Sequence, residues 1–367
     1  MLVPKEDFIG LAGIAHLATG GQPPLLTAHR RAFEEFARDK AIGMDGYERH
    51  WKVGMEVKSH LAAMTGLLAD DFALIGNASE GIVRVITSLD WRPGDNAVVS
   101  ALDFESGRFA LAGLTGLGIQ TQFVAPRKWY LETSDLLYAC NGRTRIVYLS
   151  LVNALTGQLI NLKPISDALQ QRGIVLLLDV SHALGIVPVD GTLCDFLVSS
   201  TYKFLMGPHS GIFAWNSRRH PEFVPQAVGW NSGDPAEAPK VFDLAKSGRR
   251  AELGNSNHLD VYLLRESLKY LRMIPSAELS HHVGAVTERL CDGLAKLGYE
   301  VITPMTSTDR GPNVCFAFPQ PLRFVDEAAR EGILLWGGDG RVRASAAAFV
   351  EFNDVERFLD FAARYPR

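Results

Sequence analysis

The chain of 367 residues has few cysteines and no block of like charge. Its four cysteines lie far apart and form no Cys-x-x-Cys pair, which is typical of reduced thiols in the cytoplasm. The 37 basic and 41 acidic residues give a net charge of −4 without a basic run, which argues against nucleic acid or a membrane surface as a partner. The first ten residues mix charged with apolar side chains, so we expect no signal peptide and predict a cytoplasmic protein.

Long apolar runs are also missing. The most apolar stretch, residues 173–189, is shorter than a membrane span and carries Asp179 and His182 in its middle. It is typical of a buried strand and the turn that follows it. No G-x-G-x-x-G follows the first predicted strand, which disfavours a nicotinamide-dependent oxidoreductase.

What is present is a regular alternation of short apolar runs with helical patterns. It predicts an α/β fold with a mostly parallel, doubly wound sheet, because strand–helix alternation places helices on both faces of such a sheet. Helices are predicted at 79–88, 106–116 and 164–172. The seven predicted strands are residues 72–76, 96–100, 119–124, 144–149, 174–179, 195–199 and 211–216.

The pattern changes after about residue 258. Leucine and valine recur at steps of three and four over residues 279–297, which predicts an amphipathic helix. Strands near 314–318, 333–336 and 341–344, a helix near 325–331 and a closing helix from Asp354 complete a small α+β domain. We interpret residues 221–250, rich in glycine, proline and polar residues, as a long loop.

Ligands in open α/β sheets bind outside the carboxyl ends of the strands, so the residues that follow predicted strands are candidate site residues. Ser79 opens a helix directly after a strand, where free N–H groups can bind an anion, although taken alone a plain helix cap is the preferred interpretation. Phe104 follows another strand and could stack on a flat ring, although a core phenylalanine is the simpler interpretation.

Two further strand ends carry stronger signals. Asp179 ends the most apolar strand, and a buried carboxylate there requires a partner such as a protonated ring nitrogen; a helix cap beside an exposed His182 is the alternative. Lys203 lies among hydroxyl side chains before an apolar Gly-Pro turn, where a lysine can lose its proton and form an imine. Ser200 and Tyr202 could hold a phosphate beside it. A surface lysine is the alternative.

Together these residues provide what pyridoxal phosphate (PLP) needs: a phosphate site, a carboxylate for the ring nitrogen, a stacking ring and an imine-forming lysine. We find no group of residues that predicts a metal site.

Residues 176–185 and 195–208 resemble the class V aminotransferase family of fold-type I PLP enzymes, which includes cysteine desulfurases, kynureninases and isopenicillin-N-epimerase-like proteins. The quoted segments are LLLDVSHALG and DFLVSSTYKFLMGP, and Lys203 follows Asp179 by 24 positions, close to the family spacing. The resemblance implies a large PLP domain over residues 16–260 and a small domain from residues 1–15 and 261–367. It also implies a homodimer with shared sites.

The resemblance assigns a role to each matching residue. Lys203 is implied as the Schiff-base lysine, and Arg343 as the group that binds the substrate carboxylate, with Arg341 as its close competitor. Gly21 lies in a loop expected to close over the substrate, and Asn255 is expected to reach the phosphate of the neighbouring subunit. The implied cofactor contacts are Ala78, Ser79, Phe104, Asn153, Asp179, His182, Ser200 and Tyr202.

The chain departs from cysteine desulfurases because residues 332–340 are short and contain no cysteine. Cys315 lies in an apolar strand, and we interpret it as a core residue. We therefore predict a PLP enzyme that forms an external aldimine with a small amino acid, with transamination as the first interpretation. The alternatives are a β-eliminating lyase, of the C–S lyase or kynureninase kind, an epimerase, and a binding protein that has lost its chemistry.

Overall fold

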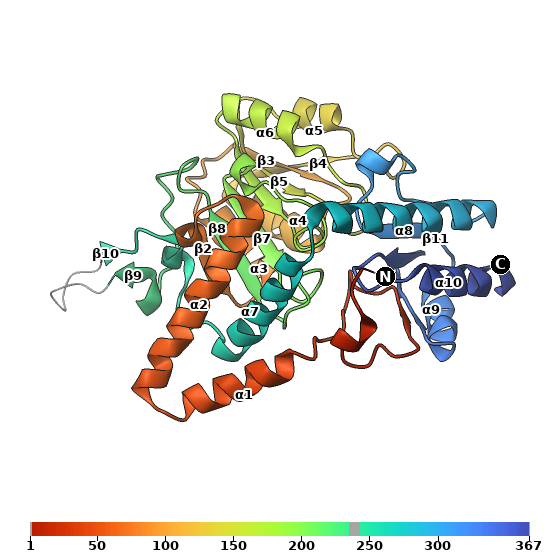
Figure 1. The fold of residues 1–367 in the computed structure, drawn as a ribbon. Coiled ribbons are helices and arrows are strands. Elements are labelled where there is room, and N and C mark those ends of the chain that lie inside the picture. Colours follow the sequence, from red (N-terminus) through yellow and green to blue (C-terminus); the bar gives the residue numbers. More distant parts are fainter. Residues whose placement is uncertain (1, 235–242, 367) are drawn as a thin grey trace.

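The computed structural model describes residues 2–234 and 243–366, and its centre is a seven-stranded sheet (Figure 1). The strand order is β2-β8-β7-β6-β5-β3-β4, and all pairs are parallel except those of β8. This confirms the predicted fold class. The strands are β2 (Phe72–Ile75), β3 (Asn96–Ser100), β4 (Gln120–Val124), β5 (Thr144–Ser150), β6 (Val175–Asp179), β7 (Phe196–Ser200) and β8 (Gly211–Trp215).

Both faces of the sheet are buried. Along β6, Leu176 and Leu178 belong to one hydrophobic cluster, whereas Val175 and Leu177 belong to another. Because successive side chains of a strand point to opposite faces, the two clusters are the two sides of the sheet. A central parallel strand that is apolar at every position is therefore explained by helices on both faces. The helices along this part of the chain are α3 (Ala78–Thr87), α4 (Glu105–Ala112), α5 (Thr133–Ala139) and α6 (Leu162–Gln171).

The C-terminal part forms a separate antiparallel sheet of order β11-β14-β13. Its strands are β11 (Asn313–Ala317), β13 (Trp336–Gly338) and β14 (Arg341–Ser345), and its helices are α8 (Ser276–Lys296), α9 (Pro321–Arg330) and α10 (Phe352–Arg364). The N-terminal segment joins this part, because β1 (Ala15–His16) pairs with β12 (Ile333–Leu334), and Figure 1 shows the N-terminus beside α10. The exact domain limits stay a prediction.

Several elements were not anticipated. Helices α1 (His29–Lys40), α2 (Met44–Thr65) and α7 (His258–Met273) pack on one another (Figure 1). The predicted loop of residues 221–250 is partly wrong, since it contains short 3-10 helices at Trp230–Ser232 and Gly248–Ala251 and the strand pair β9 (Gly233–Asp234) and β10 (Asp243–Leu244). Residues 235–242 of that segment lie outside the described residues. The helix predicted at 106–116 ends at Ala112 and continues as a 3-10 turn.

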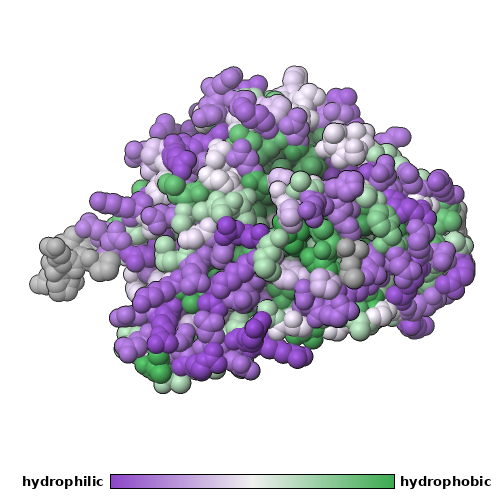
Figure 2. Space-filling view, in the orientation of Figure 1, coloured by the Kyte–Doolittle hydropathy of each residue, from purple (hydrophilic) through white to green (hydrophobic). Residues whose placement is uncertain are grey.

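Hydrophilic side chains cover most of the face in Figure 2, with hydrophobic residues gathered in its central part. Over residues 2–234 and 243–366, none of the helices combines the length and the apolar character needed to cross a membrane.

Gly211 brings two segments of the sheet unusually close. It pairs with Ser200 at the end of β7, and a Cβ at Gly211 would lie 2.4 Å from the Asn77 carbonyl carbon and 2.8 Å from the Ala78 nitrogen. Because these atoms belong to backbone, they cannot move aside cheaply. Glycine is therefore what allows β8 to contact the first turn of α3.

We expect Gly211→Ala to lower the free energy of unfolding by about 1–3 kcal/mol, because overpacking against backbone strains both segments. Urea unfolding followed by circular dichroism measures the change. Gly113→Ala is the control, since no atom lies within 4 Å of a Cβ placed there. Equal stability of the two variants would contradict the close packing.

Candidate active site

A cavity of about 440 Å³ lies where the carboxyl ends of the central strands meet the small C-terminal sheet. Its walls come from segments that are distant in the sequence, and it includes six of the predicted site residues: Gly21, Phe104, His182, Tyr202, Lys203 and Arg343. The other lining residues are Gly20, Leu102, Asp103, Glu105, Ala154, Leu155, Trp336, Asp339 and Arg341.

Lys203 lies three residues after β7 and is buried. Its Nζ atom is 5.4 Å from the centre of the Phe104 ring and 5.8 Å from that of Tyr202. Burial lowers the pKa of Lys203 to about 8; the charge of Asp179 opposes this shift and that of Arg343 adds to it. An amine with such a pKa is partly neutral near pH 7, as a nucleophile or general base must be.

Asp179 is the last residue of β6 and its carboxylate is held on both oxygens. The Tyr148 hydroxyl donates to Oδ2 (2.9 Å) and the Ser181 backbone N–H donates to Oδ1 (2.8 Å). Burial, and then the charges of Asp179 and Asp103, hold the pKa of Tyr148 well above its usual value, so this hydroxyl remains a donor. Two donors stabilise the ionised form of a buried carboxylate, which is the form that attracts a cationic ring nitrogen.

Asp103 is a second buried carboxyl group on the cavity wall. Its Oδ1 atom accepts from the Ser150 backbone N–H (3.0 Å), and its Oδ2 atom has no partner among the described residues. Burial raises the pKa of Asp103 to about 7; the hydrogen bond from Ser150 opposes the shift and the charge of Asp179 adds to it.

His182 is oriented by a chain of hydrogen bonds that sequence reasoning missed. The Asn313 amide donates to His182 Nδ1 (3.0 Å), and Asn313 Oδ1 accepts from the Ser345 hydroxyl (2.8 Å). Ser345 accepts in turn from the backbone N–H of Gly20 (3.2 Å). An amide N–H can only donate, so Nδ1 of His182 is an acceptor and the ring proton lies on Nε2. Asn313 at the edge of an apolar strand carries no sequence signal of this role.

The predicted phosphate residues surround the first turn of α3. Ala78 and Ser79 begin this helix, and the Ser79 hydroxyl lies 2.7 Å from that of Ser106 in the first turn of α4. Ser200 pairs with Gly211, and the backbone of Gly211 contacts Asn77 and Ala78. The buried hydroxyl of Ser200 has no partner among the described residues. Free N–H groups at a helix start, with spare hydroxyls beside them, suit a phosphate.

The β13–β14 hairpin forms another wall of the cavity that Lys203 lines. Arg341 and Arg343 are both buried on β14, and each guanidinium carbon lies 4.8 Å from the centre of the Trp336 ring. Arg343 Nη1 donates to the Ala154 carbonyl (3.1 Å). Burial is the main reason that the pKa of Arg343 falls to about 10, so the side chain remains a cation at neutral pH.

Six predicted residues do not line this cavity: Ala78, Ser79, Asp179 and Ser200, described above, and Asn153 and Asn255. The Asn153 side chain holds its own turn, since Nδ2 donates to the Leu102 carbonyl and Oδ1 accepts from the N–H groups of Leu155 and Thr156. Asn255 is exposed and accepts a hydrogen bond from the Tyr47 hydroxyl (2.8 Å). Their proposed contacts with the cofactor and with the partner's cofactor stay predictions.

The residues present fit PLP. The unpartnered hydroxyl of Ser200 and the start of α3 suit its phosphate, the doubly held Asp179 carboxylate suits its ring nitrogen, and the Lys203 amine suits its aldehyde. Phe104 is 44% exposed although it lies over Lys203, so its ring face is free for stacking.

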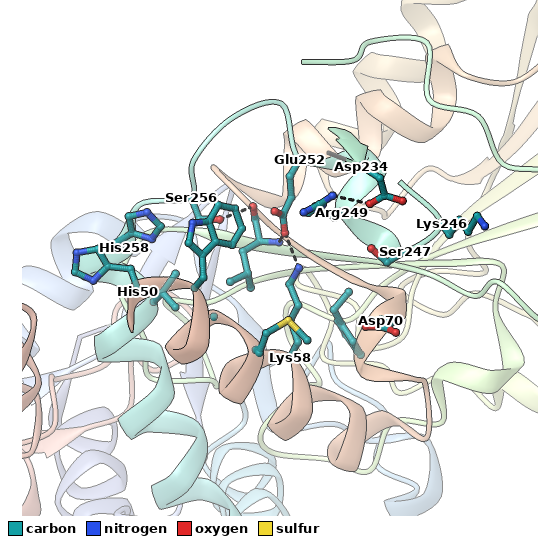
Figure 3. A pocket seen from close by; sticks show the side chains of 16 residues that line it. His50, Lys58, Asp70, Asp234, Lys246, Ser247, Arg249, Glu252, Ser256 and His258 are labelled. Carbon is teal, nitrogen blue, oxygen red and sulfur yellow. Dashed lines mark hydrogen bonds and ion pairs between the residues drawn. The ribbon is translucent and has the colours of Figure 1, made fainter. Parts of the chain in front are cut away.

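A second cavity of about 320 Å³ lies among α2, β2 and residues 246–258 (Figure 3). Lys58 points from α2 at Glu252 and forms a buried ion pair (2.8 Å), and Arg249 pairs with Asp234 (2.6 Å) at the rim. The Lys58 and Arg249 charges are thus already paired, and the predicted lysine and arginine of the site line the other cavity instead. We therefore place the chemistry in the Lys203 cavity.

Comparison with known proteins agrees with this fold. The family model described as aminotransferase class-V matches residues 53–358. A kynureninase of Deinococcus radiodurans is 28% identical over 289 residues, covering 76% of this chain and 69% of the relative. A kynureninase of Burkholderia mallei is 22% identical over 361 residues, covering 90% of this chain and 83% of the relative.

Solved structures share the fold at lower identity. A complex of the cystine C–S lyase C-DES with its reaction product, cysteine persulfide, superimposes with a TM-score of 0.90 at 20% identity, over 98% of this chain and 100% of that chain. The apo cysteine desulfurase of Thermococcus onnurineus has a TM-score of 0.90 at 18% identity, over 98% and 96% of the two chains.

The shifted pKa of Lys203 predicts how imine formation depends on pH. The neutral amine is the reactive form, and its fraction rises as the pH rises through about 8 rather than through the ordinary 10.5. We expect the rate at which the apoprotein forms its visible absorption band with added PLP to increase between pH 7 and pH 9 and then to level off. Lys203→Ala is the control, and it should show only the spectrum of the added PLP. A rate that still rises steeply above pH 10 would contradict the shift.

Proposed function

The chain belongs to the aminotransferase class-V family, and on this basis we propose that it is a PLP-dependent lyase acting on a small amino acid. The observation that carries the proposal is that the buried Lys203 amine and Arg343 line one cavity, with the Asp179 carboxylate close enough to act on the pKa of Lys203. A general base and a carboxylate-binding group on opposite walls can hold an amino acid with its α-carbon between them. Binding proteins have no need of such an amine.

Each residue then has a definite task. Arg343 binds the α-carboxylate of the substrate through the guanidinium nitrogens that the Ala154 carbonyl leaves free. The Lys203 amine accepts the α-proton, because its lowered pKa leaves it partly unprotonated near neutrality. Asp179, oriented by its two donors, would hold the ring nitrogen, and the Nε2 proton of His182 is available to an acceptor on the ring. Bound PLP supplies the electron sink that stabilises negative charge at the α-carbon.

Transamination was the first interpretation of the sequence, and the relatives favour the lyase alternative instead. Kynureninases and a cystine C–S lyase cleave a bond at the side chain of an amino acid, and their likeness supports the same class of reaction here. A persulfide-forming desulfurase is disfavoured, because all four cysteines are free and buried and none lines the Lys203 cavity. Free cysteines also support a reducing compartment such as the cytoplasm.

Product analysis separates a lyase from an aminotransferase. We expect the PLP-loaded enzyme to release a side-chain fragment from one member of an amino-acid panel that includes L-kynurenine and L-cystine, without any 2-oxo acid acceptor. Lys203→Ala should lower the rate by roughly 10²–10⁴-fold, the usual contribution of a general base. Turnover that requires a 2-oxo acid and leaves the cofactor in its amine form would instead identify an aminotransferase.

We further propose that the enzyme is a homodimer in which Asn255 completes the partner's site. Asn255 is exposed and is not among the residues that line its own Lys203 cavity. Large apolar side chains flank it, since Trp230 is 65% exposed and Leu253 is 41% exposed. Asn231 donates its backbone N–H to the Leu253 carbonyl, which holds the two segments together. Exposed aromatic and aliphatic side chains around a polar group are typical of a protein interface.

A mixed dimer tests the shared site. We expect Asn255→Glu to weaken PLP binding roughly tenfold or more, because a carboxylate beside the phosphate removes a hydrogen-bonded partner and adds repulsion. A co-purified dimer of Lys203→Ala with Asn255→Glu contains one intact site, so it should bind PLP with native affinity at half occupancy. Absorption titration and light scattering measure affinity and mass. A monomer, or normal PLP affinity in Asn255→Glu, would contradict the proposal.

A further inference from the structure

We propose that Arg341 forms a second anion-binding position next to Arg343, so that the substrate is an amino acid with an acidic group on its side chain. The inference rests on the proposed function, because it assigns the α-carboxylate to Arg343. It specifies the substrate class of the same site.

The β13–β14 hairpin places the two guanidinium groups on one wall. Arg341 and Arg343 are two positions apart on β14, so their side chains leave the same face of the strand at a spacing of roughly 7 Å. The connecting residues Asp339 and Gly340 both have positive φ, 47° and 72°, as a two-residue type I′ turn requires. This turn pairs Gly338 with Arg341 and Trp336 with Arg343, which sets Trp336 against both guanidinium groups.

Both arginines have unused donors although both are buried. Arg341 is 6% exposed and Arg343 is 5% exposed, and the Nε atoms of both lack a partner among the described residues. Arg341 forms one ion pair, from Nη1 to Asp339 Oδ2 (3.2 Å), and the Asp339 side chain is 75% exposed. Exposed ion pairs contribute little and are readily exchanged. The buried cations Arg341 and Arg343 thus have one exposed carboxylate, that of Asp339, between them. Each arginine can therefore bind an anionic group of a ligand.

The other charged residues that line the cavity do not neutralise the positive charge of Arg341. Glu105 lies on the rim at the start of α4, is exposed, and forms no ion pair within the described chain. Asp103 is buried and accepts from Ser150. Lys203 adds a further basic group. A ligand with one carboxylate would leave Arg341 without a buried partner, whereas a ligand with two would satisfy both arginines.

The two arginines are distinguished by their position relative to the reacting centre. Burial, and then the charges of Lys203 and Arg343, hold the pKa of His182 well below its usual value, and Arg343 also lowers that of Lys203. A Cβ at Gly20 would lie 3.3 Å from Arg343 Nε and 2.7 Å from Asn313 Oδ1, and Asn313 holds His182. Arg343 is therefore the arginine beside the His182 hydrogen-bond chain, where we place the α-carboxylate. Arg341 lies two residue pairs closer to the turn and would face the side chain of the substrate. A carboxylate or sulfinate two or three bonds from the α-carbon matches this separation.

The test compares acids with their amides, which have nearly the same shape but one charge less. Wild-type enzyme loaded with PLP is titrated with L-aspartate and L-asparagine, and with L-glutamate and L-glutamine, following the shift of the cofactor band. We expect an acid to bind roughly 10- to 100-fold more tightly than its amide, as charge-assisted hydrogen bonds allow. Arg341→Gln should abolish this preference by weakening the acid and leaving the amide unchanged.

Two further variants make the result specific. Asp339→Asn keeps the positive φ that asparagine tolerates and removes the competing carboxylate, so it should tighten binding of the acid. Arg92→Gln, an exposed arginine paired with Asp90, is the matched control and should change nothing. An equal loss of acid and amide binding in Arg341→Gln would overturn the inference, because both arginines would then bind the α-carboxylate.

A second readout does not depend on the reaction. Succinate should raise the melting temperature of the protein more than succinamate does, with and without PLP, and Arg341→Gln should remove the difference. If the protein fails to bind PLP but shows this difference, the proposed function fails while the anion position stands. If it binds PLP and turns over amino acids with no preference for acids, the function stands and the second anion position is overturned.

Discussion

The structure depends on keeping a lysine amine buried at the end of a parallel strand. Lys203 is enclosed by Phe104, Tyr202 and the hairpin wall, and Asp179 favours its charged form whereas Arg343 disfavours it. Desolvation makes the amine reactive, and the nearby carboxylate limits how far its pKa falls. The same burial explains why Asp179 needs two donors, since an unsupported carboxylate would take a proton instead of attracting a cation.

The site is assembled from segments that are far apart in the sequence. The hydrogen-bonded chain from Gly20 through Ser345 and Asn313 to His182 connects the N-terminal loop, two strands of the small sheet and the exit of β6. Since each of these groups is buried and partnered, moving one of them leaves another unsatisfied. The hydrogen bonds that fix the His182 ring proton on Nε2 therefore also fix the position of the loop that contains Gly20.

The cofactor end and the substrate end of the cavity are built by different means. Strand ends and helix starts of the large sheet supply the groups that suit PLP, and such groups are set by the topology of an open α/β sheet. The β13–β14 hairpin supplies Trp336, Arg341 and Arg343, and its tight turn controls their register. Substrate selection can therefore change with the hairpin while the cofactor groups remain in place.

The sequence alone predicted the seven strands of the sheet and the places of Asp179 and Lys203, because a doubly covered strand leaves an apolar run and a polar residue directly after it stands out. It missed that Tyr148 binds Asp179 and that Asn313 binds His182. A side chain inside a predicted strand is interpreted as part of the core, and its hydrogen-bond partner comes from another segment. It named Arg341 only as a competitor of Arg343. The two-residue spacing places both arginines on one face of β14, but that this face lines the Lys203 cavity was decided by packing against distant segments, which no local pattern encodes.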